Sequence, residues 1–165
     1  MDGHVLLIGV LVGLLATVVM DLGGGLGLLL GIASRSPRRM GHELIGRWIG
    51  YMFQGKFKHA DILQSPPLRG ELPFGILIHY LIGVILTLIY FAFLSITQLP
   101  SSALMAIAYG LATTVSPWFL MFPSEGMGWL GRDAPGKAHL ARASLFNHAF
   151  FGIGLALWIA VLKSF

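Results

Sequence analysis

Asp21, His79 and His148 are ionisable residues in a sequence that is otherwise nearly free of charge around them. Asp21 is the single charge in residues 5–34, and the two histidines lie in long uncharged runs. A charged residue at the centre of a membrane helix costs about 2.5–3.5 kcal/mol to insert, so ionisable residues there are functional candidates. Histidine changes charge near neutral pH, and imidazole and carboxylate both bind transition metals. These residue types therefore suit a proton or cation relay, or a metal site.

Three interpretations stay open for these residues. A relay of protons or cations would use Asp21, His79, His148 and Glu71. His79 and His148 would alternatively hold a metal ion or the iron of a haem, although no cysteine is present for covalent haem attachment. The structural alternative for Asp21 is a buried carboxyl that accepts a hydrogen bond from a Thr or Tyr hydroxyl. The cofactor, if there is one, stays unknown at this level.

Enzyme signatures are missing from the sequence. It contains no HExxH, no GxSxG and no Walker loop. If the protein were a lipid-modifying membrane enzyme, it would use His59, Asp61 and Glu71 at the cytoplasmic face. The alternative for His59 and Asp61 is an ordinary solvated loop.

The distribution of charge also predicts the elements that must position these residues. The 165 residues are 56% hydrophobic and 11% charged, with a mean hydropathy of +0.80. A bilayer core needs about 20 apolar helical residues, so the charge-free runs predict an all-α membrane protein, a four-transmembrane-helix bundle. We predict one membrane domain, 1–165, with spans at about 4–32, 74–97, 102–122 and 144–163 and loops at 34–72 and 123–143.

The basic residues predict the orientation of the spans. The two long loops contain ten of the 11 Lys and Arg residues, and Lys163 lies on the other side. Because cytoplasmic loops are enriched in Lys and Arg, both loops should be cytoplasmic and both termini outside. The same residues would contact anionic lipid headgroups. No nucleic-acid binding is expected, because no stacking aromatic residues interleave the basic ones. The ten loop residues are Arg35, Arg38, Arg39, Arg47, Lys56, Lys58, Arg69, Arg132, Lys137 and Arg142.

Two features of the loops and the third span modify the simple bundle. Apolar residues recur at three- and four-residue spacing from Leu44 to Phe57, which predicts an amphipathic helix in the cytoplasmic interface. That helix would be either an anchor or a lid over a cavity. Pro117 should kink or break the third span.

The two halves of the chain resemble each other, which is consistent with a 2+2 internal repeat. The segment Gly13–Val18 matches Gly110–Val115, and His79–Gly83 matches His148–Gly152, in the same order. Each half would hold two spans, related by an axis along the membrane normal. The glycines fall on ladders of small residues, which let membrane helices approach closely.

A larger set of residues forms short motifs along the whole chain: Gly46-Arg47-Trp48, Gly55–His59, Ile62–Pro66, Gly70-Glu71, His79-Tyr80, Pro117, Pro123, Gly126, Gly128 and Asn147–Gly152. This set resembles one small bacterial family. The family is filed as domain of unknown function 2938, and its members are short inner-membrane proteins. The resemblance implies an inner-membrane location and marks His59, Ser65, Glu71, His79 and His148 as motif positions, but it implies no activity.

Two function classes follow from these residues. The first is a small transport or permeation component, acting as a homo-oligomer, with a polar site of Asp21, His79 and His148 near the cytoplasmic leaflet. The second is a membrane-embedded enzyme or redox subunit that holds a metal or haem through His79 and His148.

Overall fold

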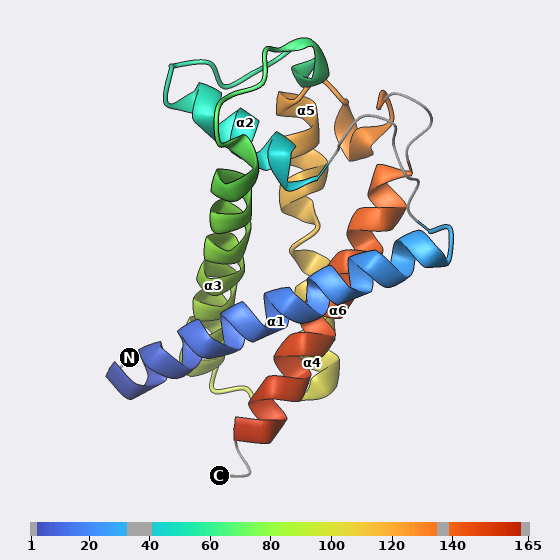
Figure 1. Cartoon of the computed structure of the whole chain (residues 1–165). Coiled ribbons are helices and arrows are strands. Elements are labelled where there is room, and N and C mark those ends of the chain that lie inside the picture. Colours follow the sequence, from blue (N-terminus) through green and yellow to red (C-terminus); the bar gives the residue numbers. More distant parts are fainter. Residues whose placement is uncertain (1–2, 33–40, 135–138, 163–165) are drawn as a thin grey trace. The chain divides into compact units, whose positions relative to one another are not determined.

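The computed structural model describes residues 3–32, 41–134 and 139–162, and the described residues are helical without any strand (Figure 1). Four segments are long and apolar enough to cross a membrane: Gly3–Leu29, Glu71–Thr97, Ala103–Ser124 and Leu140–Leu162. The prediction of an all-helical protein with four candidate spans is therefore confirmed. The helices are α1 (Gly3–Leu29), α2 (His42–Met52), α3 (Glu71–Thr97), α4 (Ala103–Ala112), α5 (Phe122–Ser124) and α6 (Leu140–Leu162).

Some of the residues behind the orientation prediction lie outside the described residues. They are Arg35, Arg38, Arg39, Lys137 and Lys163.

The third candidate span is not a continuous α-helix. Regular α4 ends at Ala112, and a π-helical turn, Pro117–Met121, leads into α5. Proline has no N–H to donate to the preceding turn, and its ring disfavours a regular helix before it. The predicted interruption by Pro117 is confirmed, and it starts already at Thr113.

The chain forms two compact units. Unit 1 comprises Met1–Gly27, Tyr80–Thr114 and Leu145–Phe165, and unit 2 comprises Leu28–His79 and Val115–Ser144. The core of unit 1 consists of Val12, Ala16, Tyr90, Ala106, Phe151, Leu155 and Ile159. The core of unit 2 consists of Leu44, Trp48, Ile62, Phe122, Met127 and Ala134.

The helix α2 occupies the segment with the predicted amphipathic pattern. Its Leu44 and Trp48 are buried in the core of unit 2, and Trp48 Nε1 donates a hydrogen bond to the carbonyl of Phe57 at 2.9 Å. Phe53, directly after the helix, is 82% exposed. The location of α2 in a membrane interface stays a prediction, as do its roles as anchor or lid.

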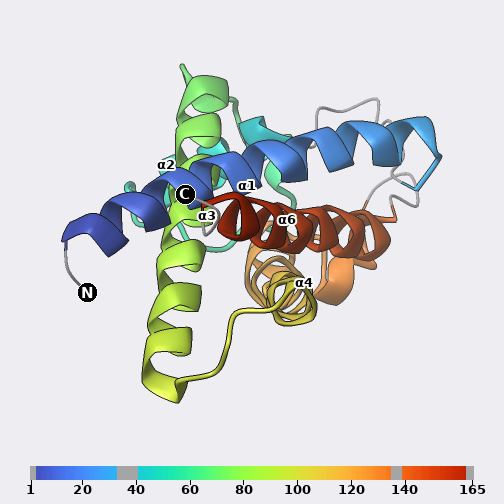
Figure 2. The ribbon, with the colours of Figure 1, turned by 90° about the horizontal axis from the view of Figure 1, so that it is seen from below.

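Helices of unit 1 touch backbone to backbone at glycines. A Cβ atom added to Gly13 of α1 would lie 2.7 Å from the Cα atom of Val84 in α3. One added to Gly110 of α4 would lie 2.6 Å from the Cα atom of Gly152 in α6. The helix α1 also passes across α6, where Gly154 lies against the backbone of α1 (Figures 1 and 2). Small residues permit this approach, as the ladders in the sequence predict.

These contacts predict a large difference between two glycine substitutions in candidate spans. Gly110→Ala should lower the free energy of unfolding by about 1–3 kcal/mol, because backbone atoms of α6 cannot move aside as a side chain can. Gly25→Ala in α1 is the control, since its new methyl group would meet nothing within 4 Å. Thermal unfolding in detergent measures both. Equal losses in the two variants would contradict the close packing.

Candidate functional site

Asp21 forms a polar pair with Tyr80 inside unit 1. The phenol of Tyr80, on α3, donates a hydrogen bond to Oδ2 of Asp21, on α1, at 2.9 Å. Both side chains are half-buried. The contact is the one that the structural interpretation of Asp21 expects, with tyrosine as the donor. Tyr80 itself was not a predicted site residue, although it follows His79 directly.

His148 forms a second polar pair in unit 1. Its Nδ1 lies 2.6 Å from Oγ1 of Thr113, and both residues are buried. The Thr113 hydroxyl also lies 2.6 Å from the carbonyl of Gly110, to which it donates its one proton. Its oxygen must then accept from the imidazole, so Nδ1 of His148 carries a hydrogen. Thr113 was missed in the sequence because its role depends on where α4 ends.

The two polar pairs join the same helices as the glycine contacts. Gly13 and the Asp21–Tyr80 pair both connect α1 with α3. Gly110 and the Thr113–His148 pair both connect the α4 segment with α6. Each half of the chain thus combines a close helix approach with a polar pair. The 2+2 repeat itself stays a prediction.

Glu71 belongs to an ion pair in unit 2. Arg47, on α2, donates from Nε to Oε2 of Glu71 at 2.8 Å and from Nη2 to Oε1 at 2.6 Å. The Nη1 atom of Arg47 donates to the carbonyls of Ile62 and Ser65 at 3.3 and 3.2 Å. The hydrogen bond to Glu71 raises the pKa of Arg47 despite its partial burial. Such a two-pronged, charge-assisted pair fixes geometry well, and it ties α2 to the start of α3.

His59 and Ser65, two motif positions, lie together in unit 2. Nδ1 of His59 is 3.0 Å from Oγ of Ser65, and the ring makes an edge contact with Tyr51 at 5.1 Å between centroids. Burial, with a smaller effect of the Lys56 charge, lowers the pKa of His59. The imidazole is only 5% exposed and is neutral near pH 7. Asp61, by contrast, caps the short helix Ile62–Gln64, where it accepts from the Leu63 amide at 2.9 Å.

Glu125 is a site residue that sequence reasoning missed. It directly follows α5, is 1% exposed, and its burial raises its pKa to about 8. Its Oε1 has no hydrogen-bond partner among the described residues. A carboxylate in a Gly- and Pro-rich loop suggests a solvated position, so the sequence offered no signal of burial. Its neighbours Pro123, Gly126 and Gly128 were recognised only as motif positions.

His42 and His79 form an imidazole pair in unit 2. Their ring centroids are 4.6 Å apart, with His42 at the start of α2 and His79 on α3. Imidazoles are common ligands of Zn, Cu, Fe and Ni, so these two side chains are a candidate pair of metal ligands. His42 was not a predicted ligand, whereas His79 was.

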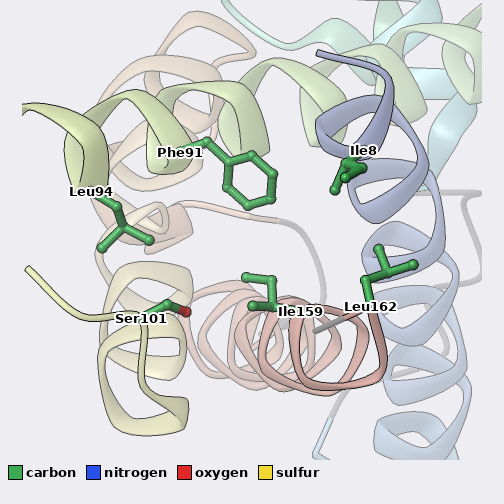
Figure 3. Close-up of a pocket in the computed structure, with 6 residues that line it drawn as sticks. All are labelled: Ile8, Phe91, Leu94, Ser101, Ile159 and Leu162. Carbon is green, nitrogen blue, oxygen red and sulfur yellow. The ribbon is translucent and has the colours of Figure 1, made fainter. Parts of the chain in front are cut away.

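A small cavity in unit 1 is apolar and holds none of the predicted site residues. Its volume is about 210 Å³. Figure 3 shows the residues around it, which are Ile8 of α1, Phe91 and Leu94 of α3, Ser101, and Ile159 and Leu162 of α6.

The predicted site residues thus fall into several local groups. His59 lies beside Ser65, and Glu71 forms an ion pair with Arg47. Asp21 is hydrogen-bonded to Tyr80, and His148 to Thr113. A site shared by Asp21, His79 and His148 stays a prediction.

Fold and polar groups together define a class: an all-helical protein with four apolar helices long enough to cross a membrane. Within that class, the chain belongs to the family described as protein of unknown function (DUF2938), whose model matches residues 10–162. The resemblance found in the sequence is confirmed. No curated protein and no solved structure matches the chain. The family brings no activity with it, so function must be argued from the residues.

The Arg47–Glu71 pair generates a stability prediction. Arg47→Met should lower the free energy of unfolding by about 2 kcal/mol, because it leaves the Glu71 carboxylate without its partner, as in other mostly buried pairs. Both side chains are 12–13% exposed, which keeps the loss below that of a fully enclosed pair. Arg132→Met is the matched control, since its pair with Asp133 is 74% and 60% exposed. Detergent unfolding curves compare them, and a similar loss in both variants would contradict the role given to Arg47.

Proposed function

We propose that this protein is a transport component of the bacterial inner membrane that moves protons or cations across the bilayer, as a homo-oligomer. The observation that carries the proposal is the pair of polar contacts between candidate spans, Asp21–Tyr80 and Thr113–His148. Ionisable residues within membrane helices are expensive and commonly mark ion pathways or proton relays. The two pairs supply a carboxyl, a phenol, a hydroxyl and an imidazole, all of which exchange protons.

The interrupted third span supports the same proposal. Irregular backbone at membrane depth is tolerated where it is buried in protein or lines a cavity, and transporters commonly use broken helices. Here α4 ends at Ala112, and Thr113, the first residue after it, binds His148. The break therefore coincides with one of the two polar pairs. Internal repeats are also common in transporters, and the 2+2 repeat would place the protein among them.

The proposed orientation has both termini outside and both long loops in the cytoplasm. Among the described residues, Arg47, Lys56, Lys58, Arg69, Arg132 and Arg142 belong to these loops. Such an excess of basic residues is typical of cytoplasmic loops. We propose that these residues also contact anionic headgroups, and that nucleic acid is not a partner.

The transport proposal predicts that Asp21 is required for flux. Purified protein in vesicles should carry protons or monovalent cations down a gradient, read with an internal pH-sensitive dye under a potassium diffusion potential. Asp21→Asn should reduce the rate at least tenfold, because the amide cannot release a proton or balance a cation. Asp133→Asn, an exposed loop change, should leave the rate unchanged. Wild-type flux no faster than that of empty vesicles would overturn the proposal, and full activity of Asp21→Asn would remove Asp21 from the pathway.

A second candidate function is a metal-dependent or redox role, and the His42–His79 pair is the observation that favours it. Purified wild-type protein should then contain a stoichiometric metal, or show a Soret band if haem is bound. His79→Ala should lose the metal. Loss in His42→Ala would assign the site to the observed pair, and loss in His148→Ala to the predicted one. The exposed His139→Ala is the control, and metal-free, colourless wild-type protein would contradict this role.

A further inference from the structure

Two segments of unit 2 carry buried polar atoms that lack partners. The amide of His59 donates to the carbonyl of Ser124 at 2.8 Å, and the amide of Ile62 donates to that of Glu125 at 3.0 Å. Among the described residues, Nε2 of His59 and Oε1 of Glu125 are buried without a hydrogen bond. Native proteins leave few such groups, and each one calls for an explanation such as a bound ligand or a catalytic role. Here both belong to side chains that exchange protons.

The two segments are held together tightly. Gly126 has a φ of +82°, and a side chain there would collide with the carbonyl of Ala60. Glu125 is 1% exposed and His59 is 5% exposed, so water does not reach either side chain freely. Ser65, bonded to Nδ1 of His59, is only partly buried. Of the three residues, Glu125 is the most buried, His59 is slightly less buried and Ser65 is the most exposed.

We propose that Glu125, His59 and Ser65 form a proton-binding site in unit 2, in which Glu125 holds the proton and His59 exchanges it with solvent through Ser65. The site goes beyond the transport proposal, since none of its residues lies in a candidate membrane span. In the exchange, the carboxyl O–H bond breaks as an N–H bond forms at Nε2 of His59. The imidazolium then releases its Nδ1 proton to Oγ of Ser65, whose own proton leaves to water. For the first transfer, a side-chain rotation or a bridging water must connect the Glu125 carboxyl with Nε2 of His59.

Among the described residues, the charged groups on the surrounding elements leave Glu125 without an ionic partner. Arg47 of α2 is engaged by Glu71, and the carboxylate of Asp61 accepts from Leu63 and Gln64 at 2.9 Å each. Lys56 acts on His59, and Tyr51 contacts the His59 ring. Arg132 and Asp133, beyond the turn, face each other at 3.6 Å near the solvent. Burial is then the dominant effect, and it favours the neutral acid.

Infrared spectroscopy of the whole protein in detergent tests the site without a transport assay. We expect the carbonyl stretching band of a protonated carboxylic acid at pH 6–7, disappearing with a midpoint near pH 8. The band should be absent from Glu125→Gln and retained in Asp21→Asn, which distinguishes this site from the transport residues. A wild-type midpoint near 4.5, the ordinary pKa of a glutamate side chain, would overturn the proposal.

Stability gives a second reading of the same group. Burial raises the pKa of Glu125 in the folded state above the unfolded value of 4.5. The contribution of Glu125 to the free energy of unfolding is therefore full below pH 4.5 and is lost as the pH rises through about 8. The Tm of the wild type should therefore fall between pH 5 and 8 more steeply than that of Glu125→Gln. Parallel curves would contradict a buried neutral carboxyl.

The route through His59 and Ser65 has its own test. After transfer to D2O, the carboxylic band of Glu125 shifts as its proton is replaced, and the shift can be timed. Ser65→Ala should slow this exchange at least threefold, and His59→Gln should slow it further. Ser144→Ala, which removes a buried hydroxyl elsewhere in the unit, should not. Unchanged exchange in both Ser65→Ala and His59→Gln would remove them from the proposed site.

Discussion

Backbone contact at glycines is the constraint on which the polar chemistry of unit 1 depends. Lipid offers helices no hydrophobic reason to associate, so close packing and interhelical hydrogen bonds must hold them together. Gly13 lets α1 approach the backbone of α3, and only at that separation can the short Asp21 side chain reach the Tyr80 phenol. Gly110 has the same effect for α4 and α6. The hydrogen bonds therefore follow from the packing, and removing the packing would leave both polar pairs open.

Unit 2 combines close glycine contacts between helices with an ion pair. Gly46 and Gly75 place α2 directly against the backbone of α3, and Arg47 then fixes the contact through its two bonds to Glu71. The remaining nitrogen of Arg47 holds the carbonyls of Ile62 and Ser65. One guanidinium thus orders the helix, the start of the next helix and the loop that carries His59. Lysine could not replace it, because a single ammonium lacks the planar fork.

Long runs without charged residues predict the four candidate spans, because burying a charged side chain in lipid is costly. Pro117 predicts the break in the third span for an equally local reason, the missing N–H. Pairs of interacting side chains cannot be predicted in this way, because they depend on contacts between segments that are distant in the sequence. Thr113 and Tyr80 are ordinary in sequence and become site residues through helix approach, and Arg47 looked like one of many loop cations. Glu125 is the extreme case, because its burial arises from hydrogen bonds to residues 59–62, far away in the chain.

Asp21 and Glu125 show how the same group acquires different chemistry. Asp21 has a hydroxyl donor at 2.9 Å, which offsets part of the cost of burying it. Oε1 of Glu125 has no such donor among the described residues, and burial favours the neutral acid, so Glu125 avoids the cost of a buried charge by keeping its proton. A carboxyl stabilised by a donor suits an ion that passes, whereas a buried neutral carboxyl suits a proton that is held and exchanged. Under the two proposals, one kind of acid chemistry lies in the helix packing of unit 1 and another in the loops of unit 2.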